Sequence, residues 1–197
     1  MRKSKAYTVK FRRKREGKTD YKKRLSLVAS SIDRLIVRRT LNTFTVQVVR
    51  FEEIGDVTVV SGKSSELLKD FGWKSHGGNI PSAYLVGYLT GLKAKKKGVE
   101  KAILDLGLQN SSIAKVSLYA VAKGFLDAGI VVPCSEEVIP DENIIKGETI
   151  ANYAKLLKAD KDKYNKQFSG YLKKGLNPEE LVKHFEEAKQ KILSKWQ

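Results

Sequence analysis

The residues with the most evident chemistry are cations gathered near the N-terminus. Twelve of the first 24 residues are Lys or Arg, and Glu16 and Asp20 are the acidic residues among them. A segment this basic gains free energy chiefly from a polyanion, because each phosphate that it neutralises releases condensed counterions. The run Arg12-Arg13-Lys14-Arg15 is rich in Arg, whose planar fork pairs with phosphate in a bidentate way. Residues 1–24 are therefore predicted to form a nucleic-acid-binding arm.

Three aromatic rings lie among these cations and could stack on unpaired bases: Tyr7, Phe11 and Tyr21. The apolar residues of the arm are too sparse for a buried face, so we expect it to be disordered when free and to become ordered on its partner. The same basic run also fits a solubility tail or a nuclear-localisation signal, and the arm alone leaves these alternatives open.

A second group of cations surrounds the first predicted strand. Arg34, Arg38 and Arg39 flank Leu35-Ile36-Val37, and Arg34 and Arg38 share one face if the strand is regular. Charges at such positions also protect the edge of a sheet from pairing with other chains. Their place directly after a basic arm favours binding.

The whole chain is basic, with a formal net charge of +16 over 197 residues, of which 41% are hydrophobic. This is enough apolar material for one ordinary domain with appendages. An anionic membrane is a weaker partner than nucleic acid, because no run of 18 apolar residues could span a bilayer and no apolar stretch follows the basic start, as a secretory signal requires. Cys134 is the single cysteine, which rules out an internal disulfide and suits the cytoplasm.

Residues for catalysis or metal binding are few. His76, His184 and Cys134 have no metal-ligand spacing, and no nucleophile elbow or nucleotide-binding glycine motif is present. The loop His76-Gly77-Gly78-Asn79 precedes a predicted helix and could hold a phosphate, although an ordinary turn explains it better. We expect no catalytic residue, no metal site, no cofactor and no small-molecule substrate.

The hydrophobic pattern predicts a mixed α/β core over residues 25–133. Strands are expected at 35–37, 44–51 and 57–60 as an antiparallel meander, because β-branched and aromatic residues dominate them and the turns are short. Ser64 and Asn79 are expected to cap two helices; a strand at 102–108, a helix at 116–127 and a strand at 130–133 follow. The order is therefore βββ-α-α-β-α-β.

The C-terminal third reads as an acidic linker followed by helices. Residues 134–147 are the linker, and helices are expected at about 148–158, 161–174 and 178–196 within an extension over 148–197. The last helix carries one apolar stripe, which must pack on the core or on another protein: Leu181, Phe185, Ala188, Ile192 and Trp196.

The layout of strands and helices resembles the ribonuclease H-like fold, whose enzymes bind two metal ions with carboxylates on the first and fourth strands. Asp105 falls on the fourth predicted strand, but the first offers only Leu35-Ile36-Val37 between two Arg residues, with Asp33 outside it. We expect the fold without the nuclease chemistry, and Asp105 as a structural, hydrogen-bonding residue.

Three segments together resemble a known family. RRKREGKTDYKKRLSL (residues 12–27), GNIPSAYLVGYLTGLKAKKKGVEKAILDLGL (78–108) and KGFLDAGIVVP (123–133) are similar, in order and spacing, to the signatures of the archaeal-type large-subunit ribosomal protein L-eighteen family, whose eukaryotic counterpart accompanies 5S rRNA. The resemblance covers most of residues 7–133, and the helices after Ser135 resemble the family's extension less distinctively.

The resemblance implies a non-catalytic ribonuclease H-like core in the cytoplasmic large ribosomal subunit. It implies binding to 5S rRNA and its anchoring to the large-subunit rRNA at the central protuberance, beside neighbouring ribosomal proteins. The family's arm contacts map onto Arg12, Arg13, Lys14, Arg15, Lys18, Tyr21, Lys22 and Arg24, with Arg34, Arg38 and Arg39 as further candidates. We hypothesise that Asp20 positions an Arg or accepts a ribose 2′-hydroxyl.

Overall fold

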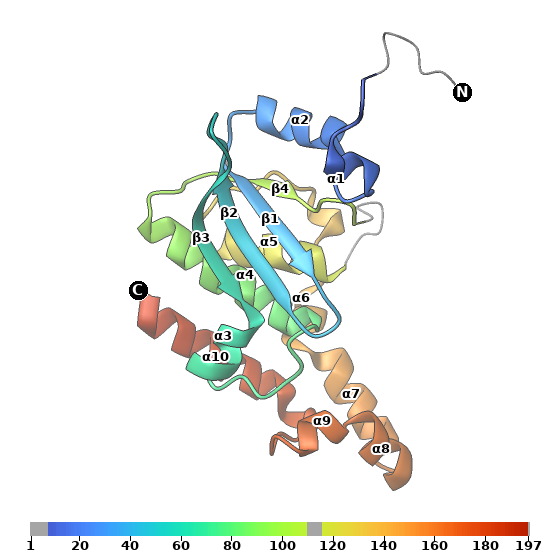
Figure 1. Cartoon of the computed structure of the whole chain (residues 1–197). Helices are drawn as coiled ribbons and strands as arrows, with labels where there is room; N and C mark the ends of the chain where they lie inside the picture. Colours follow the sequence, from blue (N-terminus) through green and yellow to red (C-terminus); the bar gives the residue numbers. More distant parts are fainter. Residues whose placement is uncertain (1–7, 110–115, 197) are drawn as a thin grey trace, which may run out of the picture.

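A four-stranded mixed sheet is the centre of the computed structural model, which describes residues 8–109 and 116–196 (Figure 1). Strands β1 (Arg34–Arg39), β2 (Phe44–Arg50) and β3 (Val57–Lys63) form the predicted antiparallel meander. Strand β4 (Ile103–Asp105) pairs with β1 in parallel, which gives the order β3-β2-β1-β4. The predicted mixed α/β architecture is confirmed.

The predicted fifth strand at 130–133 is wrong. Val131 makes a single parallel bridge with Lys101. The carbonyl oxygen of Val131 accepts the N–H of Ala102 at 3.0 Å, and the N–H of Val131 donates to Glu100 O at 2.9 Å. The ladder stops there, because Lys101 lies before β4 begins and Pro133 has no N–H to donate. Strand β4 is also shorter than the predicted 102–108, since Gly107 turns the chain with a φ of +63°.

Two long helices cover one face of the sheet: α4 (Ile80–Lys96) and α5 (Ser117–Asp127). Asn79 caps α4 as predicted, because its side chain accepts the N–H of Ser82 at 2.9 Å. The cap predicted at Ser64 is wrong. The short helix α3 (Ser64–Asp70) includes Ser64, whose buried hydroxyl donates to Gly77 O at 2.8 Å and accepts Phe44 N–H at 2.7 Å.

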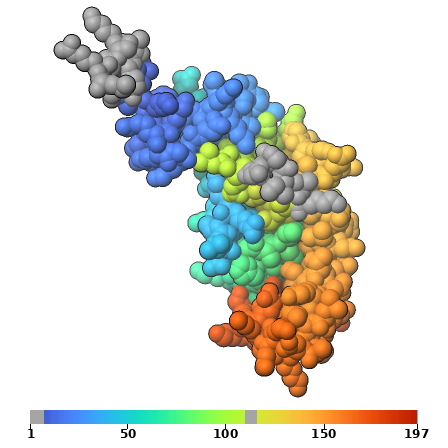
Figure 2. Space-filling model, turned by 90° about the vertical axis from the view of Figure 1, so that its right-hand side faces the viewer, coloured from blue at the N-terminus to red at the C-terminus, as the bar shows by residue number. Residues whose placement is uncertain are grey.

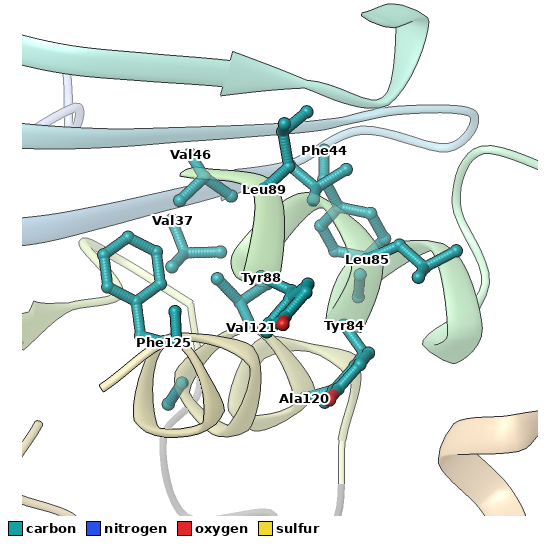
Figure 3. Packing of buried hydrophobic residues seen from close by; sticks show 14 of the residues in the cluster. Val37, Phe44, Val46, Tyr84, Leu85, Tyr88, Leu89, Ala120, Val121 and Phe125 are labelled. Carbon is teal, nitrogen blue, oxygen red and sulfur yellow. The ribbon is translucent and has the colours of Figure 1, made fainter. Parts of the chain in front are cut away.

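Helices α4 and α5 run parallel and touch through glycine. A Cβ added to Gly87 would lie 2.4 Å from Val121 O, and one on Gly91 would lie 2.7 Å from the Cβ of Ala128. Because the contacts on both helices advance in the same direction, their N-terminal ends lie at the same end of the core. Figure 3 shows the result, with Val37 and the side chains around it filling the space between the sheet and these two helices.

The C-terminal helices share this core. Helix α10 (Leu181–Trp196) packs on α4, and Leu181, Phe185, Ala188 and Ile192 are buried there. Of the two alternatives for the apolar stripe, the structure shows packing on the core. His184 stacks on Trp73 at 5.0 Å and accepts the N–H of Lys74 at 2.9 Å, which requires an unprotonated ring nitrogen.

Helices α7 (Glu148–Leu157), α8 (Lys161–Gln167) and α9 (Ser169–Leu172) lie at the lower end of the molecule in Figure 1. Helix α6 (Glu142–Lys146) precedes them, and short 3-10 turns lie at Glu136–Val138 and Pro178–Glu180. Helix α6 falls within the predicted linker at 134–147, where Ile145 is buried. The helix predicted at 161–174 is interrupted at Phe168, between α8 and α9. Among the described residues, no helix is both long and apolar enough to cross a membrane.

Candidate nucleic-acid interface

The basic arm forms two short helices at one end of the molecule. Helix α1 (Arg12–Arg15) consists of the predicted cation cluster, and α2 (Tyr21–Ala29) begins inside the predicted arm at residues 1–24. Neither helix has a buried residue. Figure 2 shows these helices in blue, at the opposite end from the C-terminal helices in orange. Tyr7, one of the predicted stacking residues, lies outside the described residues.

Contacts within the arm hold the two helices together. The rings of Phe11 and Tyr21 are 5.0 Å apart, and Arg13 Nε donates to Thr19 Oγ1 at 2.8 Å. Tyr21 therefore packs against another ring of the arm, in a tilted arrangement.

Asp20 has a different partner from the one hypothesised. Its carboxylate accepts the backbone N–H groups of Lys22 at 3.0 Å and Lys23 at 3.2 Å, so Asp20 is the N-cap of α2. A carboxylate at this position also interacts favourably with the helix dipole. Glu16, the other acid of the arm, pairs with Arg12 at 3.6 Å and Lys18 at 3.0 Å.

A groove of about 350 Å³ separates the arm from the outer face of the sheet. The arm and the sheet both supply cations to its wall: Arg13, Lys18, Lys23, Arg24, Arg34 and Arg38. Lys23 Nζ reaches across to Gly107 O at 3.4 Å, which links α2 to the turn after β4. The structure thus brings the arm cations and the sheet cations to one surface.

Arg34 lies at the base of this groove and is almost completely covered. Its side chain is only 3% exposed and pairs with Asp56 at 2.6 Å and Asp105 at 3.2 Å. Asp56 also pairs with Arg24 at 3.0 Å, which ties α2 to the sheet. A buried guanidinium with two carboxylate partners is not available to RNA, so we remove Arg34 from the predicted contacts.

Arg38 remains accessible, because 44% of its side chain is exposed. It donates to the backbone oxygen of Asp105 at 2.8 Å and to its carboxylate at 3.4 Å. The carboxylate also accepts Gly107 N–H at 2.8 Å. Asp105 therefore has the structural, hydrogen-bonding role that was predicted.

Arg39 is separated from the arm. Neighbouring residues of a strand face opposite sides of the sheet, so Arg39 lies on the side of α4 and α5. There it stacks over the ring of Phe44 at 5.8 Å and lines a different groove, beside Asn79 and Ser117.

The glycine loop before α4 has a packing function. A Cβ on Gly77 would lie 2.6 Å from Asn42 O, and one on Gly78 would lie 2.5 Å from Leu41 O. The N–H of Gly78 donates to His76 Nδ1 at 3.0 Å. The loop therefore supports the β1–β2 turn, in agreement with the simpler interpretation of its sequence.

Two residues of this interface were not predicted from the sequence. Lys23 is one of the twelve cations of the arm but is not among the predicted contacts, and Asp56 carries no predicted role. The spacing of α2 puts Lys23 on the groove side, which a helix prediction from Tyr21 would have indicated. Nothing local in the sequence pairs Asp56 with Arg34. In the described ranges, no cluster of three or more His, Cys, Asp or Glu side chains could hold a metal ion.

A comparison with protein families agrees with these features. The model of the family described as ribosomal large subunit proteins 60S L5, and 50S L18 matches residues 5–101, from the basic arm through the meander and α4 to a point just before β4. Proteins of this family bind ribosomal RNA as structural constituents of the large subunit of the cytoplasmic ribosome and serve translation. The chain belongs to this family of large-subunit ribosomal proteins.

Proposed function

We propose that the chain binds 5S rRNA and helps to anchor it to the large-subunit rRNA at the central protuberance, without catalysis. One observation carries this proposal: the arm helices present cations that have no carboxylate partner among the described residues, namely Arg13, Lys14, Arg15 and Lys22. Such cations are free to replace the counterions of an RNA backbone.

The groove beside the arm defines a path that a bound RNA strand could follow. RNA phosphates that follow α1 would meet Lys18, Lys23 and Arg38 along the same surface. Because the major groove of A-form RNA is too narrow to read, specificity would come from RNA shape and 2′-hydroxyl groups. Lys and Arg along a fixed groove suit such recognition of shape.

We propose a ribonuclease H-like core that lacks the nuclease chemistry. The meander, with β4 parallel to β1, supports this assignment. The carboxylate of Asp105 on β4 is already bonded to Arg34, Arg38 and Gly107 N–H, and the first strand has no acidic residue. The cation Arg34 therefore neutralises the position where a nuclease needs negative charge for its metals.

The experiment is a titration of the full chain against 5S rRNA and an unrelated structured RNA of equal length, with magnesium, at several salt concentrations. Neutralising Arg12, Arg13, Lys14 and Arg15 to Gln should weaken 5S binding. It should also reduce the slope of log affinity against log salt by about 3–4, at 0.7–0.9 per lost phosphate contact.

A control with the same net charge replaces four exposed lysines of the C-terminal helices by Gln: Lys155, Lys166, Lys173 and Lys183. It should keep most of the affinity and the slope. Equal binding of both RNAs would reduce the function to that of a generic basic RNA-binding adaptor. Cleavage of the RNA would support a nuclease.

A further inference from the structure

A second groove lies on the helix side of the sheet, where the N-terminal ends of α4 and α5 meet. It has a volume of about 380 Å³, and its polar lining consists of Arg39, Asn79, Ser117 and Thr149. Among the described residues, no Asp or Glu lines it. Since Arg38 and Arg39 face opposite sides of β1, the sheet separates this groove from the one beside the arm.

Ser117 is the unusual residue of this groove. It is 4% exposed, and its Oγ has no hydrogen-bond partner within the described part of the chain. Buried hydroxyl groups are rarely left in this state, because the loss of hydration is not offset. Ser117 is a lining residue of the groove, although its Oγ is covered in the unbound chain. A rotation about its Cα–Cβ bond would be needed for a ligand in the groove to accept its hydrogen bond.

The start of α5 is also without a cap. Val116 at the N-cap position has no side-chain oxygen, and the N–H groups of Ser117 and Leu118 have no acceptor within the helix. Helix α4 differs, because Asn79 caps it. Since α4 and α5 are parallel, the positive ends of both helix dipoles lie at this groove.

Arg39 adds a full positive charge to the site. It is exposed and forms no ion pair in the described ranges; its recorded contact is the ring of Phe44. A guanidinium, a hydroxyl without a hydrogen-bond partner and the first N–H groups of a helix that lacks a side-chain cap are together suited to an anion with several oxygens. A phosphate group has this chemistry.

We propose that this groove binds a phosphate group through the Ser117 hydroxyl, the first N–H groups of α5 and Arg39. In the ribosome, the phosphate belongs to an RNA segment other than the one on the arm; this clause rests on the proposed function. The sheet would then be held between two RNA segments, one on each face.

The first test uses inorganic phosphate and the full chain. In an NMR titration at constant ionic strength, the amide signals of Ser117 and Leu118 should shift and saturate. Arg39→Gln should abolish the effect, and Ser117→Ala should weaken binding by about fivefold, as expected for one hydrogen bond. Arg15→Gln, a matched loss of an exposed arm cation, should leave these shifts unchanged.

The second test uses 5S rRNA and a large-subunit rRNA fragment. If either RNA shifts the Ser117 signal and displaces phosphate, the ligand is an RNA phosphate, and Arg39→Gln should reduce the salt slope by about 0.7–0.9. If phosphate binds and neither RNA competes, the site takes a small phosphate compound.

The proposal is overturned if neither phosphate nor either RNA perturbs Ser117 or Leu118 and Arg39→Gln leaves the salt slope unchanged. A failure of the proposed function gives a different result. If the proposed function fails, the arm variants leave the RNA affinity unchanged, whereas the phosphate titration still tests the groove independently.

Discussion

Replacing Asp105 by Asn tests whether the ion network beneath the arm groove stabilises the fold. Asn preserves the volume and an oxygen for Gly107 N–H but removes the charge beside Arg34, whose side chain is 3% exposed. Breaking a buried pair from one side costs about 3–5 kcal/mol, because the other charge stays buried. Asp56 still neutralises Arg34 at 2.6 Å, so we expect the lower end, about 3 kcal/mol.

The measurement is equilibrium unfolding in urea. With a slope of about 2 kcal/mol per molar urea, a loss of 3 kcal/mol lowers the midpoint by about 1.5 M. Asp33→Asn is the matched control, because Asp33 also pairs with an Arg, but Arg50 is more than half exposed. The control should lose much less stability.

The reasoning is refuted if Asp105→Asn is as stable as Asp33→Asn. Arg34 would then be hydrated, and the groove would be open to the depth of the sheet. A second variant separates charge from packing: Arg34→Met with Asp105→Leu removes both charges and should recover much of the lost stability, because no buried charge is left unpaired. Asp56 keeps Arg24 as its partner, and Arg38, which loses Asp105, is 44% exposed.

Three further predictions concern other parts of the chain. Asp20→Ala should lower the helicity of the arm and weaken RNA binding, because loss of an N-cap costs about 1 kcal/mol. Circular dichroism measures the helicity and an RNA titration measures the affinity. An unchanged affinity would show that α2 is not needed for binding. Gly87→Ala should destabilise the fold by about 3 kcal/mol or more in urea unfolding, because the added Cβ would overlap Val121 O. Gly170→Ala is the control and should not destabilise the fold in this way, because a Cβ there meets nothing within 4 Å. Burial lowers the pKa of His184 below its ordinary 6.5, so the neutral ring stabilises the fold above pH 6.5 and this contribution is lost as the pH falls below 6.5. The thermal midpoint of the unmodified chain should therefore fall more steeply with acid than that of His184→Gln. Parallel pH profiles of the two proteins would contradict this prediction.

Local signals predicted much of the fold correctly. The strands of the meander and the cap at Asn79 depend on residues that are close in sequence. The alternation of apolar and polar residues and the type of the capping residue therefore predict them. The strand at 130–133 failed because its pairing depends on Lys101, which is remote in sequence. A run of β-branched residues shows that a strand is favourable but not that a partner edge is long enough to receive it.

The interface was predicted only in part, for two physical reasons. The arm was treated as disordered, so Asp20 was considered for RNA although its place before Tyr21 is typical of a helix cap. The burial of Arg34 depends on Asp56 and Asp105, which the fold brings together from three separate strands or turns. Charge patterning identified where the cations gather, but it could not tell an accessible cation from a buried one.

The packing of α10 on α4 affects the time at which the chain can finish folding. The sheet is complete in sequence at Asp105, and α10 begins at Leu181. At about 5–20 residues per second, the ribosome needs roughly 4–15 s to synthesise the residues between them. Through those seconds the face of α4 that α10 will cover lacks its partner, while the basic arm has already been synthesised and can attract nucleic acid. A chaperone that shields either surface during synthesis would therefore prevent the nascent chain from aggregating before its last helix arrives.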